Sequence, residues 1–154
     1  MSYHQVVLNK LTQFVKTILL ALVIFGNVSA TQAENKIHDQ RINLSLSASE
    51  KAEFLKEMRQ MLASIQGIMT GLGNKNREQI ITSARYSGNR MARATPDSVR
   101  KKLPQSFKNI GGPTHMMFEE LVIRAETDDM DMLAKFTGKL MQQCITCHAM
   151  FKAD

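Results

Sequence analysis

Tryptophan is absent from this 154-residue chain, and proline, glycine and cysteine are scarce, with 3, 8 and 2 residues respectively. So few turn-forming residues argue against a β-sandwich or barrel, which needs a turn about every 8–12 residues. Two cysteines are too few for a small scaffold held together by disulfides. The net charge of +6 is a mild excess that does not suggest binding to nucleic acid. Neither a glycine-rich phosphate-binding loop nor an HExxH zinc motif occurs.

Apolar residues make up 44% of the chain, which is enough for one packed domain. They recur every three or four residues along most of the sequence, as on one face of an α-helix. The pattern predicts helices over about 48–72, 76–94 and 97–103, another that begins at Thr114 after a break at 110–113, and a last one from about 127 to the C-terminus. We therefore predict an all-α domain over residues 34–154, arranged as an antiparallel four-helix bundle.

The first predicted helix has the clearest signals. Ser47 and Glu50 match the S-x-x-E capping box that starts a helix, and Gly71 and Gly73 are expected to end it. The apolar stripe expected to face the core consists of Leu55, Met58, Leu62, Ile65, Met69 and Leu72. The residues before the helix, 41–47, alternate between polar and apolar and are expected to form an extended lead-in.

Residues 1–33 contain no acidic residue and are predicted to be an export signal. Two lysines precede an apolar run over residues 18–25, which is shorter than the roughly 20 residues needed to cross a bilayer. Small residues follow, and a basic start, a short apolar run and a small-residue exit are typical of a secretory signal peptide. An uncleaved anchor or a buried helix is the alternative. We expect cleavage after Ala33, or else after Ala30, and a periplasmic protein without a membrane span.

Both cysteines lie in one motif, Cys144-Ile145-Thr146-Cys147-His148, near the end of the last predicted helix. C-x-x-C-H is the motif to which c-type haem is covalently attached. The two thiols can each add to a vinyl group of one porphyrin, and the adjacent imidazole can bind the iron. This attachment takes place outside the cytoplasm, in agreement with an export signal. We expect one covalent haem c, with thioether bonds to Cys144 and Cys147 and with His148 as the proximal iron ligand.

Two other chemistries remain open for this motif. The thiols could form a structural disulfide or a redox dithiol, although a redox pair usually opens a helix, where the helix N-terminus lowers the thiol pKa. A structural zinc ion needs four ligands. Besides His148, the chain after residue 33 offers only His38 and His115 as histidine ligands.

In these features the chain resembles the cytochrome c′ family. The resemblance covers residues 48–154 and rests chiefly on the C-x-x-C-H motif followed by Phe151 and Lys152, with further similarity at residues 61–67 and 95–99. Members of this family are exported four-helix bundles that carry one haem near the end of the last helix. In ordinary small cytochromes c the motif lies near the N-terminus instead. The resemblance implies the bundle fold and one haem, and it allows a homodimer, which is common in the family.

What the resemblance implies about function depends on the sixth iron ligand. In one branch of the family, a methionine of the first helix binds the iron and gives a low-spin site suited to electron transfer. In the other branch the iron stays five-coordinate and binds small gases such as nitric oxide. Met58 is the expected distal ligand and Met61 the second choice, although both residues also suit core packing. His115, at the expected start of a helix, would give a bis-histidine site, and His38 is expected to be inert.

From the sequence we therefore expect periplasmic electron transfer through a covalent haem, with gas binding as the alternative and thiol oxidoreduction third. No acid–base constellation accompanies the iron, so we do not expect an enzyme. Arg100, Lys101, Lys102 and Lys108 form a basic cluster, which is either a solvated loop or a docking patch for an acidic redox partner. Nucleic acid is not an expected partner of an exported chain with this charge.

Overall fold

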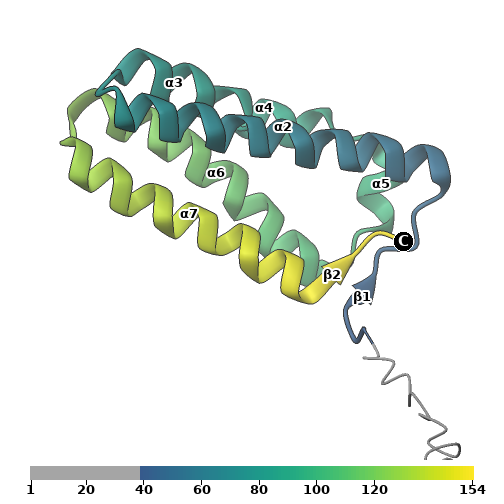
Figure 1. Cartoon of the computed structure of the whole chain (residues 1–154). Coiled ribbons are helices and arrows are strands. Elements are labelled where there is room, and N and C mark those ends of the chain that lie inside the picture. Colours follow the sequence, from purple (N-terminus) through teal and green to yellow (C-terminus); the bar gives the residue numbers. More distant parts are fainter. Residues whose placement is uncertain (1–38) are drawn as a thin grey trace, which may run out of the picture. The chain divides into compact units, whose positions relative to one another are not determined.

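The computed structural model describes residues 39–154 (Figure 1). The predicted signal peptide, both candidate cleavage sites and His38 lie outside the described residues. Most of the described chain is helical, which confirms the predicted all-α class. Over this part of the chain, no helix is both long enough and apolar enough to cross a membrane.

Residues 39–154 form long helices linked by short ones, with one very short strand near each end of this described part. The elements are β1 (Ile42–Asn43), α2 (Ala48–Gly73), α3 (Arg77–Tyr86), α4 (Asn89–Ala94), α5 (Asp97–Lys102), α6 (Gln105–Thr127), α7 (Met130–Met150) and β2 (Phe151–Lys152). Helix α2 packs against α3 and α7, and α6 packs against the same two helices. Helix α5 lies at the end of the molecule where α7 runs into β2 (Figure 1).

Helix α2 begins as predicted, but its buried face is turned relative to the predicted stripe. The capping box is formed, since the Ser47 N–H donates to Glu50 Oε2 at 2.8 Å and the Glu50 N–H donates to Ser47 Oγ at 3.4 Å. Leu62 is 69% exposed and Met69 is 51% exposed, so their prediction as core residues is wrong. The cause is that small residues on another face, such as Gly71, let α3 approach closely. The spacing of the apolar residues alone gives no sign of this contact.

The predicted helix over 76–94 is in fact two helices, α3 and α4, separated at Ser87 and Gly88. Ser87 is fully buried, and its hydroxyl hydrogen-bonds to Ser64 Oγ of α2 at 2.7 Å. A Cβ at Gly88 would collide with the carboxylate of Glu119, which accepts a hydrogen bond from the Asn89 N–H at 2.8 Å. The predicted helix is therefore interrupted at Ser87 and Gly88, where the backbone packs closely against α2 and α6.

The predicted break at residues 110–113 is wrong, because α6 runs through it without interruption. Thr114, which we predicted to start a helix, lies in the middle of α6, and its hydroxyl donates to the Ile110 carbonyl at 2.8 Å. Proline inside a helix costs about 3 kcal/mol relative to alanine, so packing must offset Pro113. Phe107 and Phe118, buried on either side of the proline, supply that packing.

Helix α7 ends at Met150, before the predicted end at the C-terminus. The following residues form β2, which pairs in parallel with β1 so that Phe151 lies opposite Ile42. The Leu44 N–H then donates to the Lys152 carbonyl at 2.9 Å. Phe151 is buried, and its burial explains why the helix stops. The extended lead-in that we predicted over 41–47 is confirmed in part by β1.

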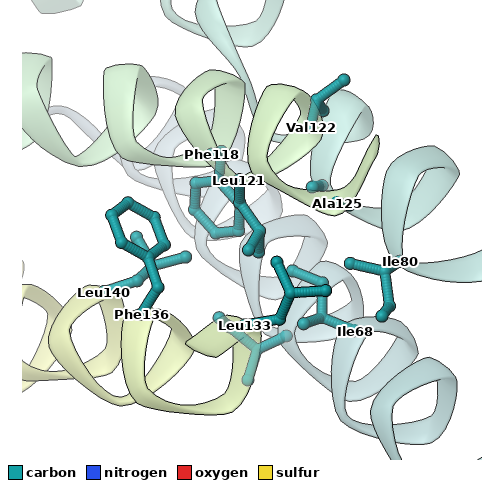
Figure 2. Close-up of a cluster of buried hydrophobic side chains, with 11 residues drawn as sticks. Ile68, Ile80, Phe118, Leu121, Val122, Ala125, Leu133, Phe136 and Leu140 are labelled. Atoms are coloured by element: carbon teal, nitrogen blue, oxygen red, sulfur yellow. The ribbon is translucent and has the colours of Figure 1, made fainter. Parts of the chain in front are cut away.

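The buried side chains form two clusters. The central cluster lies between the long helices (Figure 2) and consists of Ile65, Ile68, Ile80, Ala84, Phe118, Leu121, Val122, Ala125, Leu133, Phe136 and Leu140. The end cluster lies beside β1, β2 and α5 and consists of Leu44, Leu46, Phe54, Val99, Leu103, Phe107 and Phe151. Three aromatic rings contact one another in the end cluster. The Phe54 and Phe107 rings are tilted with centroids 5.7 Å apart, and the Phe107 and Phe151 rings meet edge to face at 5.3 Å.

Candidate functional site

A cavity of about 520 Å³ is bounded mainly by α2, α6 and α7, with α5 and its flanking residues at one side. Sites for small molecules and cofactors usually measure roughly 300–1,000 Å³, so the volume suits a cofactor. The side chains that line it are mostly apolar. All residues that the sequence predicts to bind haem or its iron line this cavity: Cys144, Cys147, His148, Met58 and Met61.

The C-x-x-C-H motif occupies the last turns of α7. Positions i, i+3 and i+4 of a helix share one face, so Cys144, Cys147 and His148 all border the cavity. Neither cysteine is in a disulfide, and the Cys144 thiol lies 3.8 Å from the Leu140 carbonyl. Arg41 donates from Nη1 to the His148 carbonyl at 3.3 Å, which ties the lead-in segment to this last turn of the helix. Both thiols are therefore free to react beside the cavity.

The two thiols are not activated as nucleophiles. Burial raises the pKa of the Cys144 thiol, and burial together with the neighbouring Cys144 raises the pKa of Cys147 to about 11. Redox cysteines need a lowered pKa, which a helix N-terminus or a nearby cation provides. This pair lies near the C-terminal end of α7, where the helix dipole disfavours an anion. The environment of the motif therefore argues against a redox dithiol.

Met58 and Met61 of α2 are the methionines that the sequence predicts as candidates for the distal iron ligand. Both side chains are half-buried, and both line the cavity. Met58 packs against the end cluster and Met61 against the central cluster, so the cavity lies between the two clusters. The turned face of α2 thus brings Met61 to the cavity as well as Met58, although only Met58 was placed on the predicted stripe.

Helix α6 contributes an open wall and an imidazole. An added Cβ at Gly112 would meet no atom within 4 Å, so the helix presents bare backbone there. His115 is half-buried and lies in the middle of α6, which corrects its predicted place in a first helical turn. Its Nδ1 lies 2.7 Å from the Ser87 carbonyl oxygen.

Charged side chains also line the cavity. Arg100 of α5 and Lys108 of α6 border it, and Arg100 donates from Nη2 to the Thr95 carbonyl at 2.8 Å. Glu57 lines both this cavity and a neighbouring groove. Burial raises the pKa of Glu57, although the Thr95 hydroxyl donates to it at 3.4 Å and opposes that shift.

The sequence did not assign Arg100 and Lys108 to the site. We interpreted them as part of a solvated or docking cluster, together with Lys102, which pairs with Glu50 at 2.6 Å. One face of α6 carries the cavity-lining residues 108, 111, 112 and 115. This helical spacing is a sequence signal that could have identified them. It becomes visible only once α6 is known to continue through Pro113.

Comparison of the chain with protein-family models, with curated proteins and with solved structures finds no match. The resemblance to the cytochrome c′ family accordingly stays a prediction from the sequence motifs.

Proposed function

We propose that this protein is a mono-haem c-type cytochrome that carries electrons, with its haem in the cavity between α2, α6 and α7. The observation that carries the proposal is that C-x-x-C-H borders a mostly apolar cavity of cofactor size. Cys144 and Cys147 would form the thioether bonds, and His148 would be the proximal iron ligand. The bound haem would supply one-electron chemistry at iron.

The side chains around the cavity fit such a group. Apolar walls suit the porphyrin, the bare backbone at Gly112 leaves space for a planar ring, and both thiols are unpaired. Haem also carries two anionic propionates, and Arg100 and Lys108 supply two cations at the cavity. Both cations are exposed at the edge of the cavity, where a propionate could reach them from the haem.

We further propose that α2, α3 with α4, α6 and α7 form an antiparallel four-helix bundle like that of the cytochrome c′ family. In support, each of α2, α3, α6 and α7 packs against two of the others. A homodimer is a further expectation from that resemblance.

Among the methionines, Met58 is the first candidate for the sixth iron ligand and Met61 the second, because both thioethers line the cavity. Ligation by a protein side chain on both faces would leave the coordination unchanged on reduction, which suits electron transfer. The alternative is a five-coordinate iron that binds nitric oxide or another small gas. The open wall at Gly112 favours that alternative, because it leaves room for a small ligand.

We place this cytochrome in a bacterial periplasm on the strength of the export signal predicted in the sequence. Its partners would be redox proteins with acidic surfaces. Lys101 and Lys102 are exposed on α5 next to the cavity residue Arg100, so they could guide such a partner towards the haem. No enzymatic turnover is proposed.

Visible and electron paramagnetic resonance spectra of the chain, produced with haem-maturation machinery, test the proposal. Electron transfer predicts a low-spin ferric haem with a sharp reduced α-band, whereas gas binding predicts a high-spin ferric haem that binds nitric oxide. Met58→Leu and Met61→Leu are matched variants of similar volume. Loss of the low-spin state in only one of them would identify a methionine ligand. A correctly exported chain without any haem absorption would overturn the proposal.

A further inference from the structure

Residues 39–154 contain two histidines, His115 and His148, and both line the cavity. They come from different helices, α6 and α7, which pack against each other. The proposed haem uses His148 and leaves the imidazole of His115 without a role.

The hydrogen bond to Ser87 defines the tautomer of His115. A backbone carbonyl only accepts hydrogen bonds, so Nδ1, at 2.7 Å from the Ser87 oxygen, carries the proton. In the neutral ring, Nε2 then keeps its lone pair and has no proton to donate. Histidines that bind metals usually hold the ring in this way, with the other nitrogen donating to a carbonyl or a carboxylate.

The group that orients the ring is itself fixed. Ser87 is fully buried, and its hydroxyl bonds at 2.7 Å to Ser64 Oγ on α2. Its N–H donates to the Ala84 carbonyl at 3.0 Å. The carbonyl that holds His115 is thus anchored to both α2 and α3, so the imidazole is oriented before any ligand arrives.

The two methionines lack such an anchor. A methionine side chain has three rotatable bonds and adapts readily to its surroundings, whereas a ligand held by a second hydrogen bond is already in place. We infer that His115, through Nε2, is the sixth ligand of the proposed haem iron in preference to Met58 or Met61. This inference rests on the proposed haem attachment and makes the site bis-histidine.

The consequence is a specific kind of electron carrier. Methionine–histidine ligation raises the reduction potential of haem iron, so a second histidine in place of the thioether predicts a lower potential. It also predicts a low-spin iron without an open coordination position, and therefore slow or absent binding of nitric oxide.

The test uses the haem-loaded full chain and its His115→Ala variant, with Met58→Leu and Met61→Leu as controls. We expect the wild type and both methionine variants to give the electron paramagnetic resonance signals of a low-spin bis-histidine haem. Their absorption spectra should lack the charge-transfer band of an iron–methionine bond. His115→Ala should become high-spin, and added imidazole should restore the low-spin state. Far-ultraviolet circular dichroism checks that the variant is folded.

A second variant, His115→Met, keeps a ligand-capable side chain in case His115→Ala fails to fold. It should produce the iron–methionine charge-transfer band that the wild type lacks. A haem-loaded wild type that is high-spin, or a His115→Ala variant with an unchanged low-spin spectrum, would overturn the role of His115 while haem attachment stands. A wild type without covalent haem would instead overturn the proposed function.

Discussion

The central cluster and the cavity share the helices α2, α6 and α7, and α3 adds to the central cluster, yet the two regions are packed in opposite ways. In the central cluster, Ile68, Ile80 and Leu133 are each 0% exposed (Figure 2). At the cavity, Met58 and Met61 stay half-buried, and a volume of about 520 Å³ remains between the helices. The cavity therefore differs from the close-packed core in its loose packing, and its volume suits a small molecule or a cofactor.

We expect substitutions in the central cluster to cause the largest losses of stability. Phe118→Ala should lower the free energy of unfolding by about 3–5 kcal/mol, because a fully buried aromatic side chain leaves a cavity. Met58→Ala, at the edge of an existing cavity, should cost only about 1–2 kcal/mol. Urea denaturation of both variants gives the two values. Equal losses would contradict the contrast between the two regions.

Two helical glycines give a matched pair of smaller changes. An added Cβ at Gly71 would lie 2.7 Å from Ile80 Cγ1 and 3.1 Å from the Asn76 carbonyl, so Gly71→Ala should cost about 1–3 kcal/mol. Gly112→Ala meets no atom within 4 Å and should gain about 0.5–1 kcal/mol from its better helix propensity. Thermal unfolding of the two variants checks the signs, and a destabilised Gly112→Ala would show that this wall is closed.

Removing a helix cap should cost the same stability in both regions, because the two regions differ in side-chain packing and not in their helix ends. Ser47 caps α2 beside the end cluster, and Asp129 caps α7 beside the central cluster by accepting from the Met132 N–H at 2.8 Å. Ser47→Ala and Asp129→Ala should each cost about 1 kcal/mol. If chemical denaturation gives clearly unequal losses for the two caps, the regions differ in their backbone as well as in side-chain packing.

The smallest expected effect is a pH-dependent one at Glu57. Burial raises its pKa above the ordinary value of 4.5, so the folded state holds the proton more tightly than the unfolded state. This group therefore favours folding at low pH, and its contribution is lost as the pH rises through the raised pKa. Glu57→Gln should be more stable than the wild type at neutral pH, by less than about 1 kcal/mol, and no more stable in acid. A gain that persists in acid would point to another cause.

Local signals in the sequence predicted the parts of the fold that depend on local physics. The capping box fixed the start of α2, and the described structure confirms the all-α class. The sequence failed at Gly111-Gly112-Pro113, because packing of Phe107 and Phe118 outweighs the poor helix propensity there. It also failed at Gly88, where a contact with the Glu119 carboxylate decides the backbone.

The residues of the candidate site also fall into two groups: those that a local sequence signal identifies and those that only the fold brings to the cavity. C-x-x-C-H is contiguous in the sequence, so its residues could be named before the structure, and their haem chemistry stays a prediction. Arg100 and Lys108 come from different helices and border the same cavity only in the folded chain. The orientation of His115 depends on Ser87, 28 residues earlier, and no short motif records that hydrogen bond.

The most direct test of the central claim is the intact mass of the purified chain under denaturing conditions, after export in a host with haem-maturation machinery. We expect the mass of the processed chain plus one haem, retained after denaturation because both thioether bonds are covalent. A Cys144→Ala, Cys147→Ala double variant should show the chain alone. A wild-type chain that is correctly exported but carries no added mass would contradict the assignment of the cavity to haem.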